Sequence, residues 1–115
     1  MASKIDPGQA QSLIQEFRSQ NKSSADPLKT ADGQHLNGFF LDRESLDSIL
    51  KDPNVTGIHV NFAKHPNFVG KPDNVPTLVY SGSVPNTAPG ALAPHVSTGD
   101  TFGGDTPTCP PWCVN

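Results

Sequence analysis

The chain has 115 residues, of which 34% are hydrophobic, and a formal net charge of -3 at pH 7. This length is typical of a single domain, and a weakly negative charge with no cluster of Lys or Arg argues against nucleic-acid binding. No stretch approaches the roughly 18 consecutive apolar residues of a membrane-spanning helix. The N-terminus lacks the apolar segment of a secretory signal, so the expected location is the cytoplasm by default. Export by a route that uses no signal stays open.

A first helix is predicted over residues 7–20. Asp6 is a suitable N-cap and Pro7 suits the first helical position. Apolar residues then recur at helical spacing, at Ala10, Leu13, Ile14 and Phe17. Because this apolar stripe is narrow, the helix is expected to lie on the body of the domain rather than inside it. Asn21 is the expected C-terminal stop.

A polar, turn-rich loop over residues 22–37 leads into a short predicted strand, Gly-Phe-Phe-Leu at 38–41. A second helix is predicted over residues 43–51. Asp42 is its expected N-cap, and Leu41 and Leu46 occupy the two positions of a hydrophobic staple. Proline at position 53 ends this helix.

Two further strands complete the predicted body. Residues 55–63 show the period-two alternation of a half-buried strand, and residues 77–82 form the next apolar run. The long connection between them, residues 64–76, favours an antiparallel hairpin. The prediction is therefore an α+β domain over residues 1–84, with one small antiparallel sheet of about three strands and two helices in the order α-β-α-β-β.

Residues 85–115 are predicted to form an extended or flexible tail. The segment holds six of the twelve prolines and four of the ten glycines, and it shows neither a helical nor a strand period. Both cysteines and the only tryptophan lie near its end, in the run Cys109-Pro110-Pro111-Trp112-Cys113. Four apolar side chains are able to pin the tail to the body: Leu92, Val96, Phe102 and Trp112.

Three states are open to the pair Cys109 and Cys113. In the first state both cysteines are reduced thiols in a mobile tail. In the second they form a disulfide. A polyproline helix rises ~3.1 Å per residue and would hold the two α carbons roughly 12 Å apart, whereas a disulfide needs about 4.4–6.8 Å. A disulfide therefore requires a turn at Pro110-Pro111, in which the proline at the third turn position is cis.

The third state is ligation of zinc or another thiophilic metal by Cys109 and Cys113. Two thiolates need further ligands, which histidines of this chain or a second chain would supply. The candidate histidines are His59, His65, His35 and His95. A lone histidine on the polar side of a strand, such as His59, is more often an ordinary surface residue than a metal ligand.

The ending Cys-Pro-Pro-Trp-Cys follows a body that contains Phe-Leu-Asp-Arg-Glu-Ser-Leu and Gly-Ile-His-Val-Asn-Phe. With these motifs the chain, from about Phe39 onward, resembles small bacterial proteins of unknown function that end in Cys-Pro-Pro-any-Cys. The resemblance implies a short α+β body with a cysteine-containing tail. It implies no activity.

The sequence contains no motif that favours an enzyme, and two hypotheses for function follow. The first is a non-enzymatic interaction module, without a cofactor, whose tail is displayed to a protein partner or modified by another enzyme. Its expected anchor residues are Trp112, Pro110, Pro111 and Phe102. The second is a small metal-binding or thiol-redox protein that uses Cys109 and Cys113. The oligomeric state stays open in both.

Overall fold

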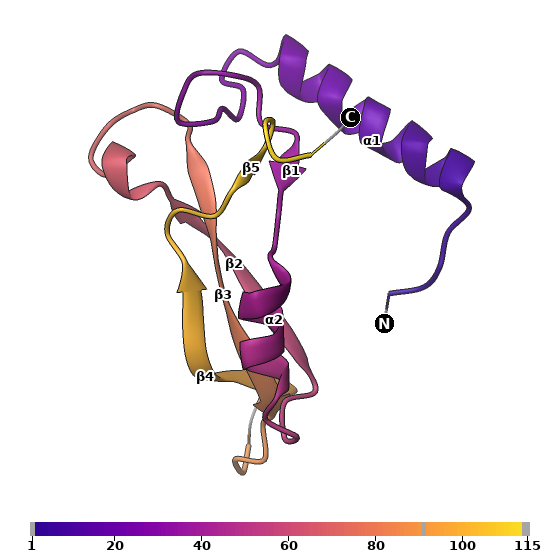
Figure 1. The fold of residues 1–115 in the computed structure, drawn as a ribbon, viewed down its shortest axis with the longest axis vertical. Coiled ribbons are helices and arrows are strands. Elements are labelled where there is room, and N and C mark those ends of the chain that lie inside the picture. The colour runs from indigo at the N-terminus through magenta and orange to yellow at the C-terminus, as the bar shows by residue number, and fades with distance from the viewer. Residues whose placement is uncertain (1, 91, 114–115) are drawn as a thin grey trace.

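The computed structural model describes residues 2–90 and 92–113. This part of the chain contains two α-helices, a short 3-10 helix and five strands (Figure 1). The five strands form two separate antiparallel sheets. The larger sheet has the strand order β2-β3-β4, and the smaller sheet joins β1 to β5. In chain order the elements are α1 (Pro7–Ser23), β1 (Gly38–Phe39), α2 (Arg43–Leu50), β2 (Gly57–Lys64), η1 (Pro66–Phe68), β3 (Pro76–Pro85), β4 (His95–Gly103) and β5 (Thr108–Cys109).

The predicted architecture, one sheet of about three strands followed by an extended tail, is wrong. The segment read as tail contains β4, which pairs with β3, and β5, which pairs with β1. The pattern of β4 is hidden because its ladder is interrupted: Ser81 pairs with Thr101 but Gly82 pairs with Thr98, so residues 99–100 are inserted between two pairs. This insertion and the scarcity of large apolar residues remove the period-two signal.

Helix α1 begins as predicted, with the Asp6 carboxylate accepting hydrogen bonds from two first-turn N–H groups at 3.0 and 3.2 Å. It continues to Ser23, so the predicted stop at Asn21 is wrong. The Asn21 side chain is buried and has another role. Its Nδ2 donates to the Leu28 carbonyl at 3.1 Å, and its Oδ1 accepts from the Leu28 N–H at 2.8 Å. Asn21 thus fastens the following loop to the helix.

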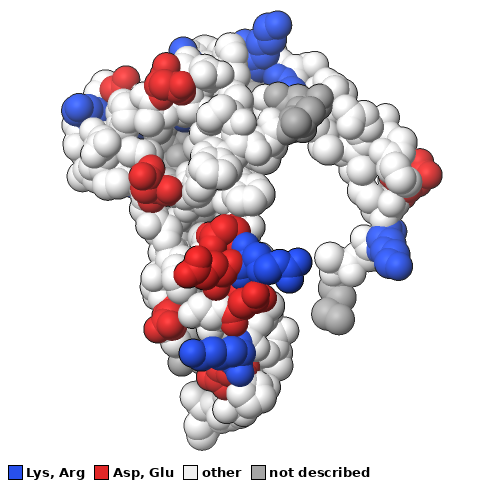
Figure 2. Space-filling model, viewed as in Figure 1, with Lys and Arg blue, Asp and Glu red and all other residues white. Residues whose placement is uncertain are grey.

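The apolar stripe of α1 does not lie on the body of the domain, contrary to the prediction. Leu13, Ile14 and Phe17 are all exposed. Figure 1 shows α1 extending away from the larger sheet, and in Figure 2 open space separates this helix and the N-terminal segment from the lower body. The helix is joined to the rest of the fold near its C-terminal end, through Asn21.

The hydrophobic core lies between α2 and one face of the larger sheet. Helix α2 begins where the Asp42 carboxylate accepts a hydrogen bond from the Ser45 N–H at 2.9 Å. Ile49 of α2 packs with Leu78 and Tyr80 of β3 to form the buried centre. The partly buried residues around this centre are Phe39, Leu41, Leu46, Val55, Ile58 and Phe102. Figure 2 shows charged residues gathered over the outer surface of this region.

Candidate functional site

The C-terminal part of the chain is built into the fold through β5. We call residues 108–113 the tail clasp. The Asn37 N–H donates to the Cys109 carbonyl at 2.8 Å, and the Phe40 N–H donates to the Pro107 carbonyl at 2.9 Å. These bonds flank the β1–β5 pairing and hold the start of the clasp against the strand that precedes α2.

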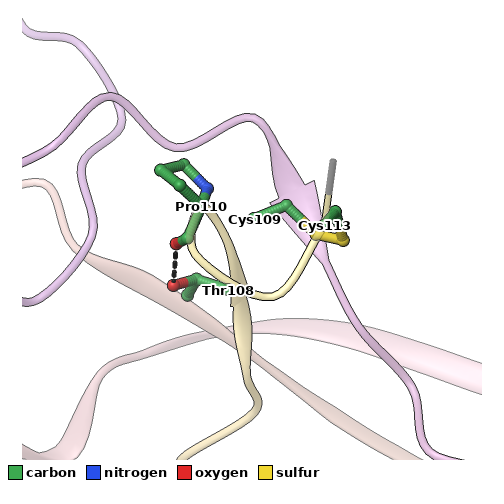
Figure 3. The surroundings of a disulfide bond; sticks show 4 residues. All are labelled: Thr108, Cys109, Pro110 and Cys113. Carbon is green, nitrogen blue, oxygen red and sulfur yellow. Dashed lines mark hydrogen bonds between the residues drawn. A yellow bond between two sulfur atoms is a disulfide. The ribbon is translucent and has the colours of Figure 1, made fainter. Parts of the chain in front are cut away.

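The clasp is a closed ring (Figure 3). Cys109 and Cys113 are joined by a disulfide, with their α carbons 4.9 Å apart. The peptide bonds that precede Pro110 and Pro111 are both cis, whereas the turn expected from the sequence requires this of one proline, at the third turn position. Thr108, which directly precedes the ring, is bonded to it twice: its hydroxyl donates to the Pro110 carbonyl at 2.7 Å, and its carbonyl accepts from the Trp112 N–H at 2.9 Å. The disulfide is therefore the state that the structure adopts among the three left open.

Trp112, the aromatic residue of the clasp, is exposed, yet its position is well defined. Its ring stacks on Phe40, with centroids 5.5 Å apart and an interplanar angle of 20°. The side chains of Trp112 and Phe40 are 61% and 39% exposed. We call this pair the aromatic platform. The platform exposes a large apolar surface to water. The backbone of Trp112 is restrained by the disulfide ring of the clasp.

A pocket of about 210 Å³ opens beside the platform. Pro111 and Trp112 of the clasp line one part of it, and Thr30, Ala31 and Asp32 of the loop after α1 line another. Its buried lining is formed by Thr30, His65, Val75, Thr77 and Thr106. The pocket is smaller than the roughly 300–1,000 Å³ that holds most small-molecule ligands, and its size suits one side chain of a bound segment better.

His65 lies in this pocket and has a defined tautomer when neutral. Its Nδ1 accepts a hydrogen bond from the Asn67 N–H at 3.2 Å, which places the ring hydrogen on Nε2. Nε2 lies 3.8 Å from Oδ1 of Asp105, too far for a hydrogen bond but close enough for electrostatic attraction. The ring also packs edge-on against Phe68 at 5.6 Å.

The charged groups that line the pocket are acidic. Asp105 is fully exposed at its rim, and Asp32 is exposed on the opposite loop. Hydrogen bonds from the Thr30 hydroxyl, and then from the Gln34 side chain, lower the pKa of Asp32 below its ordinary value. No Lys or Arg is among the described residues that line this pocket. The pocket therefore presents negative charge at neutral pH.

The structure brings some of the predicted site residues together and separates others. Trp112, Pro110 and Pro111 lie in the clasp, but Phe102 lies beside Tyr80 in the core, with ring centroids 6.0 Å apart. His59 lies on β2, where its Nδ1 is 2.6 Å from the Ser97 hydroxyl oxygen. Among the described residues no group of three or more His, Cys, Asp or Glu side chains is arranged to hold a metal ion.

Phe40 is the member of the platform that the sequence reading missed. Neighbouring residues of a strand point to opposite sides, so an adjacent pair of phenylalanines at 39 and 40 places one ring in the core and the other outside it. Phe39 does pack against the core, and Phe40 is the exposed one. The alternation of side chains along a strand could therefore have predicted that one of these two phenylalanines is exposed.

No protein-family model matches the chain, and no curated protein or solved structure is significantly similar to it. The bonded pair Cys109 and Cys113 agrees with a Cys-any-any-any-Cys ending. Among the described helices, none is both long and apolar enough to cross a membrane.

Proposed function

We propose that this protein is a non-enzymatic interaction module whose aromatic platform, Trp112 and Phe40, binds a segment of a protein partner. The observation that carries the proposal is the exposure of a tryptophan held by a closed ring and by stacking on a second aromatic residue. Tryptophan is enriched among the residues that dominate binding energy at interfaces. A restrained side chain loses little conformational entropy when a partner covers it, so more of the contact energy is available for affinity.

The pocket beside the platform defines the chemistry of the partner segment. An apolar residue of that segment covers Trp112, and a neighbouring basic side chain enters the acidic pocket between Asp32 and Asp105. Complementary charge of this kind favours the correct register and speeds association. The partner is therefore a peptide segment with an apolar residue next to Lys or Arg.

The first prediction tests the platform. Peptides selected from a random library on the immobilised full chain are expected to pair an apolar residue with a basic one. Trp112→Ala is expected to weaken binding of a selected peptide by about 30-fold or more, the effect of removing a hot-spot side chain, as measured by isothermal titration calorimetry.

Leu92→Ala is the matched control, because Leu92 is a fully exposed apolar residue on the connection between β3 and β4. Figure 1 shows this connection at the opposite end of the molecule from β5. This variant is expected to bind with the affinity of the unaltered chain. Peptides that bind equally well to Trp112→Ala would show that the platform is not the binding surface. A circular dichroism spectrum of each variant checks that the fold is retained.

A related version makes the clasp the target of another enzyme. Mass spectrometry of protein purified from its native host distinguishes a modified or cleaved clasp from an intact one. An unmodified clasp removes this version and leaves the binding proposal in place.

The bonded state of Cys109 and Cys113 favours one alternative, a thiol-redox protein that cycles between disulfide and dithiol. In that case both cysteines are essential and Trp112 only shapes the site. Double replacement by serine, together with thiol titration before and after a reductant, separates the two proposals. If the serine variant still binds the selected peptides, with an affinity lowered only by loss of the ring's restraint, the redox alternative loses its support.

A further inference from the structure

The surface of this chain is too large for a compact monomer of its mass. The chain of 12.2 kDa exposes 8122 Å², whereas compact monomers of this mass expose about 6,100 Å². Its radius of gyration is 16.3 Å, compared with about 13 Å for a compact domain of the same length. The excess of about 2,000 Å² is surface that a compact fold of this mass would bury.

Part of this excess is the apolar stripe of α1. Leu13 and Phe17 are 58% and 46% exposed, and Ile14 is exposed beside them. These residues recur at the spacing that puts them on one side of a helix. An amphipathic helix gains most of its stability by packing this side against another element, and in the described chain α1 is tied down mainly at Asn21. Within the described part of the chain, the stripe therefore lacks the packing partner that its pattern requires.

A second apolar surface without cover lies on the larger sheet. Val60 and Phe62 of β2 pair with Tyr80 and Leu78 of β3, and directly paired residues lie on the same face of a sheet. They therefore belong to the core face. Phe62 is nevertheless 84% exposed, because the helix that covers this face is short. The eight residues of α2 extend only about 12 Å, and they pack mainly on β3 and β4, with Ile58 of β2 at the margin of the core.

We propose that a second copy of this chain covers both surfaces: α1 of one protomer packs its stripe against Val60 and Phe62 of its partner, and the exchange is reciprocal. The two elements match in length, since seventeen helical residues span about 25 Å and eight strand residues about 27 Å. A two-fold axis makes both contacts identical and leaves no stripe uncovered.

The area agrees with a stable dimer. Two protomers that each buried the excess surface would form an interface of about 4,000 Å² in total, within the roughly 2,000–5,000 Å² of obligate homodimers. The dimer leaves the aromatic platform out of the contact, so it is independent of the peptide-binding proposal.

The second prediction is that the full chain has twice its monomer mass in solution, as measured by light scattering coupled to gel filtration. Leu13→Asp with Phe17→Asp places two charges in the stripe and is expected to abolish the dimer peak. Gln15→Asp with Ser19→Asp adds the same charge at the same spacing on the other side of the helix, and its dimer peak is expected to remain. A monomeric unaltered chain, or equal loss of the dimer in both variants, overturns the proposal.

Disulfide cross-linking identifies the contact even if a stripe variant fails to fold. A chain with Leu13→Cys and a second chain with Phe62→Cys are mixed and oxidised. A cross-link between the two chains is the expected product. If a chain that carries both substitutions forms only an internal cross-link, α1 folds back on β2 of the same chain. If cross-links form only between two Leu13→Cys residues, the helices of two chains pack together. Either result overturns the proposal.

Discussion

Gly103 lies at the end of β4, where it pairs with Val79 of β3. Its φ angle is +131°, and a Cβ atom added there would lie 2.1 Å from the Leu78 carbonyl oxygen and 2.8 Å from the Val79 Cα. Backbone atoms on a central strand cannot yield as the end of a flexible side chain can. Glycine is therefore required at this position for two separate reasons, its conformation and the absence of a side chain.

The third prediction concerns this residue. Gly103→Ala is expected to lower the free energy of unfolding by about 2 kcal/mol or more, because overpacking and an unfavourable φ angle act together. Gly104→Ala is a control for conformation alone, since its φ is +87° but no atom lies within 4 Å of the added Cβ. It is expected to cost about 1 kcal/mol.

Gly57→Ala is a control for the substitution itself, because Gly57 has neither a positive φ nor a close neighbour. Urea unfolding of the three variants measures the order of their stabilities. Equal effects of Gly103→Ala and Gly104→Ala would show that the backbone of β3 tolerates the approach.

At the scale of the element, α2 depends on the side chain that begins it. Hydrogen bonds from the Ser45 hydroxyl, and then from the Ser45 N–H, lower the pKa of Asp42 below its ordinary value of 3.8. The folded state therefore binds this proton less readily than the unfolded state does. Asp42 stabilises the fold fully above pH 3.8, and this stabilisation is lost as the pH falls through the lower, folded-state pKa.

The fourth prediction is a change in acid sensitivity. Asn is as good an N-cap as Asp but does not titrate, so Asp42→Asn is expected to leave stability near neutral pH little changed. Between about pH 5 and pH 2 its unfolding free energy should fall less steeply than that of the unaltered chain. Chemical unfolding at a series of pH values measures both slopes, and parallel slopes would contradict the assigned role of the carboxylate.

Elements that depend on local signals were predictable from the sequence, and those that depend on distant partners were not. Asp6 and Asp42 mark the starts of both helices, because capping involves residues only two or three positions away. β4 carries few apolar residues and an interrupted ladder, and its order comes from the neighbouring strand β3. β5 is two residues long and exists only because β1 lies opposite.

The candidate site was predictable only in part for the same reason. The sequence drew attention to Trp112 and to the cysteine pair, because these residue types are rare in the chain. It could not place Phe40 under Trp112 or His65 beside Asp105, since each contact joins segments that only the complete fold brings together. Phe102 was predicted as a partner-binding or tail anchor, and in the structure it pairs with Tyr80 and packs against the core, a contact that depends on the pairing of β4 with β3.

For the whole molecule, the clasp closes a long loop of chain. The long loop is closed by the pairing of β1 with β5, in which Phe39 lies opposite Thr108. The disulfide closes a much shorter loop, with a sequence separation of only four. The disulfide therefore restrains the clasp and not the long loop. On chain entropy alone a ring this small stabilises the folded state by about 2 kcal/mol.

The fifth prediction follows from this division. Replacing both Cys109 and Cys113 by alanine is expected to lower stability by about 2 kcal/mol and to leave the packing of α2 on the larger sheet intact. Hydrogen exchange should accelerate selectively at the N–H groups of Asn37 and Trp112, which bond to the clasp or within it, and at that of Phe40, which bonds to Pro107 directly before the clasp. Uniform acceleration through β3 as well would show that the clasp supports the entire core.

The pairing of β1 with β5 also has a consequence for synthesis on the ribosome. Translation proceeds at roughly 5–20 residues per second, so β5 is made several seconds after β1. During that interval Gly38 and Phe39 have no strand to pair with, and Phe40 has no tryptophan to stack on. The nascent chain can form its helices early, but the aromatic platform is assembled only after residues 108–112 have emerged and paired with β1.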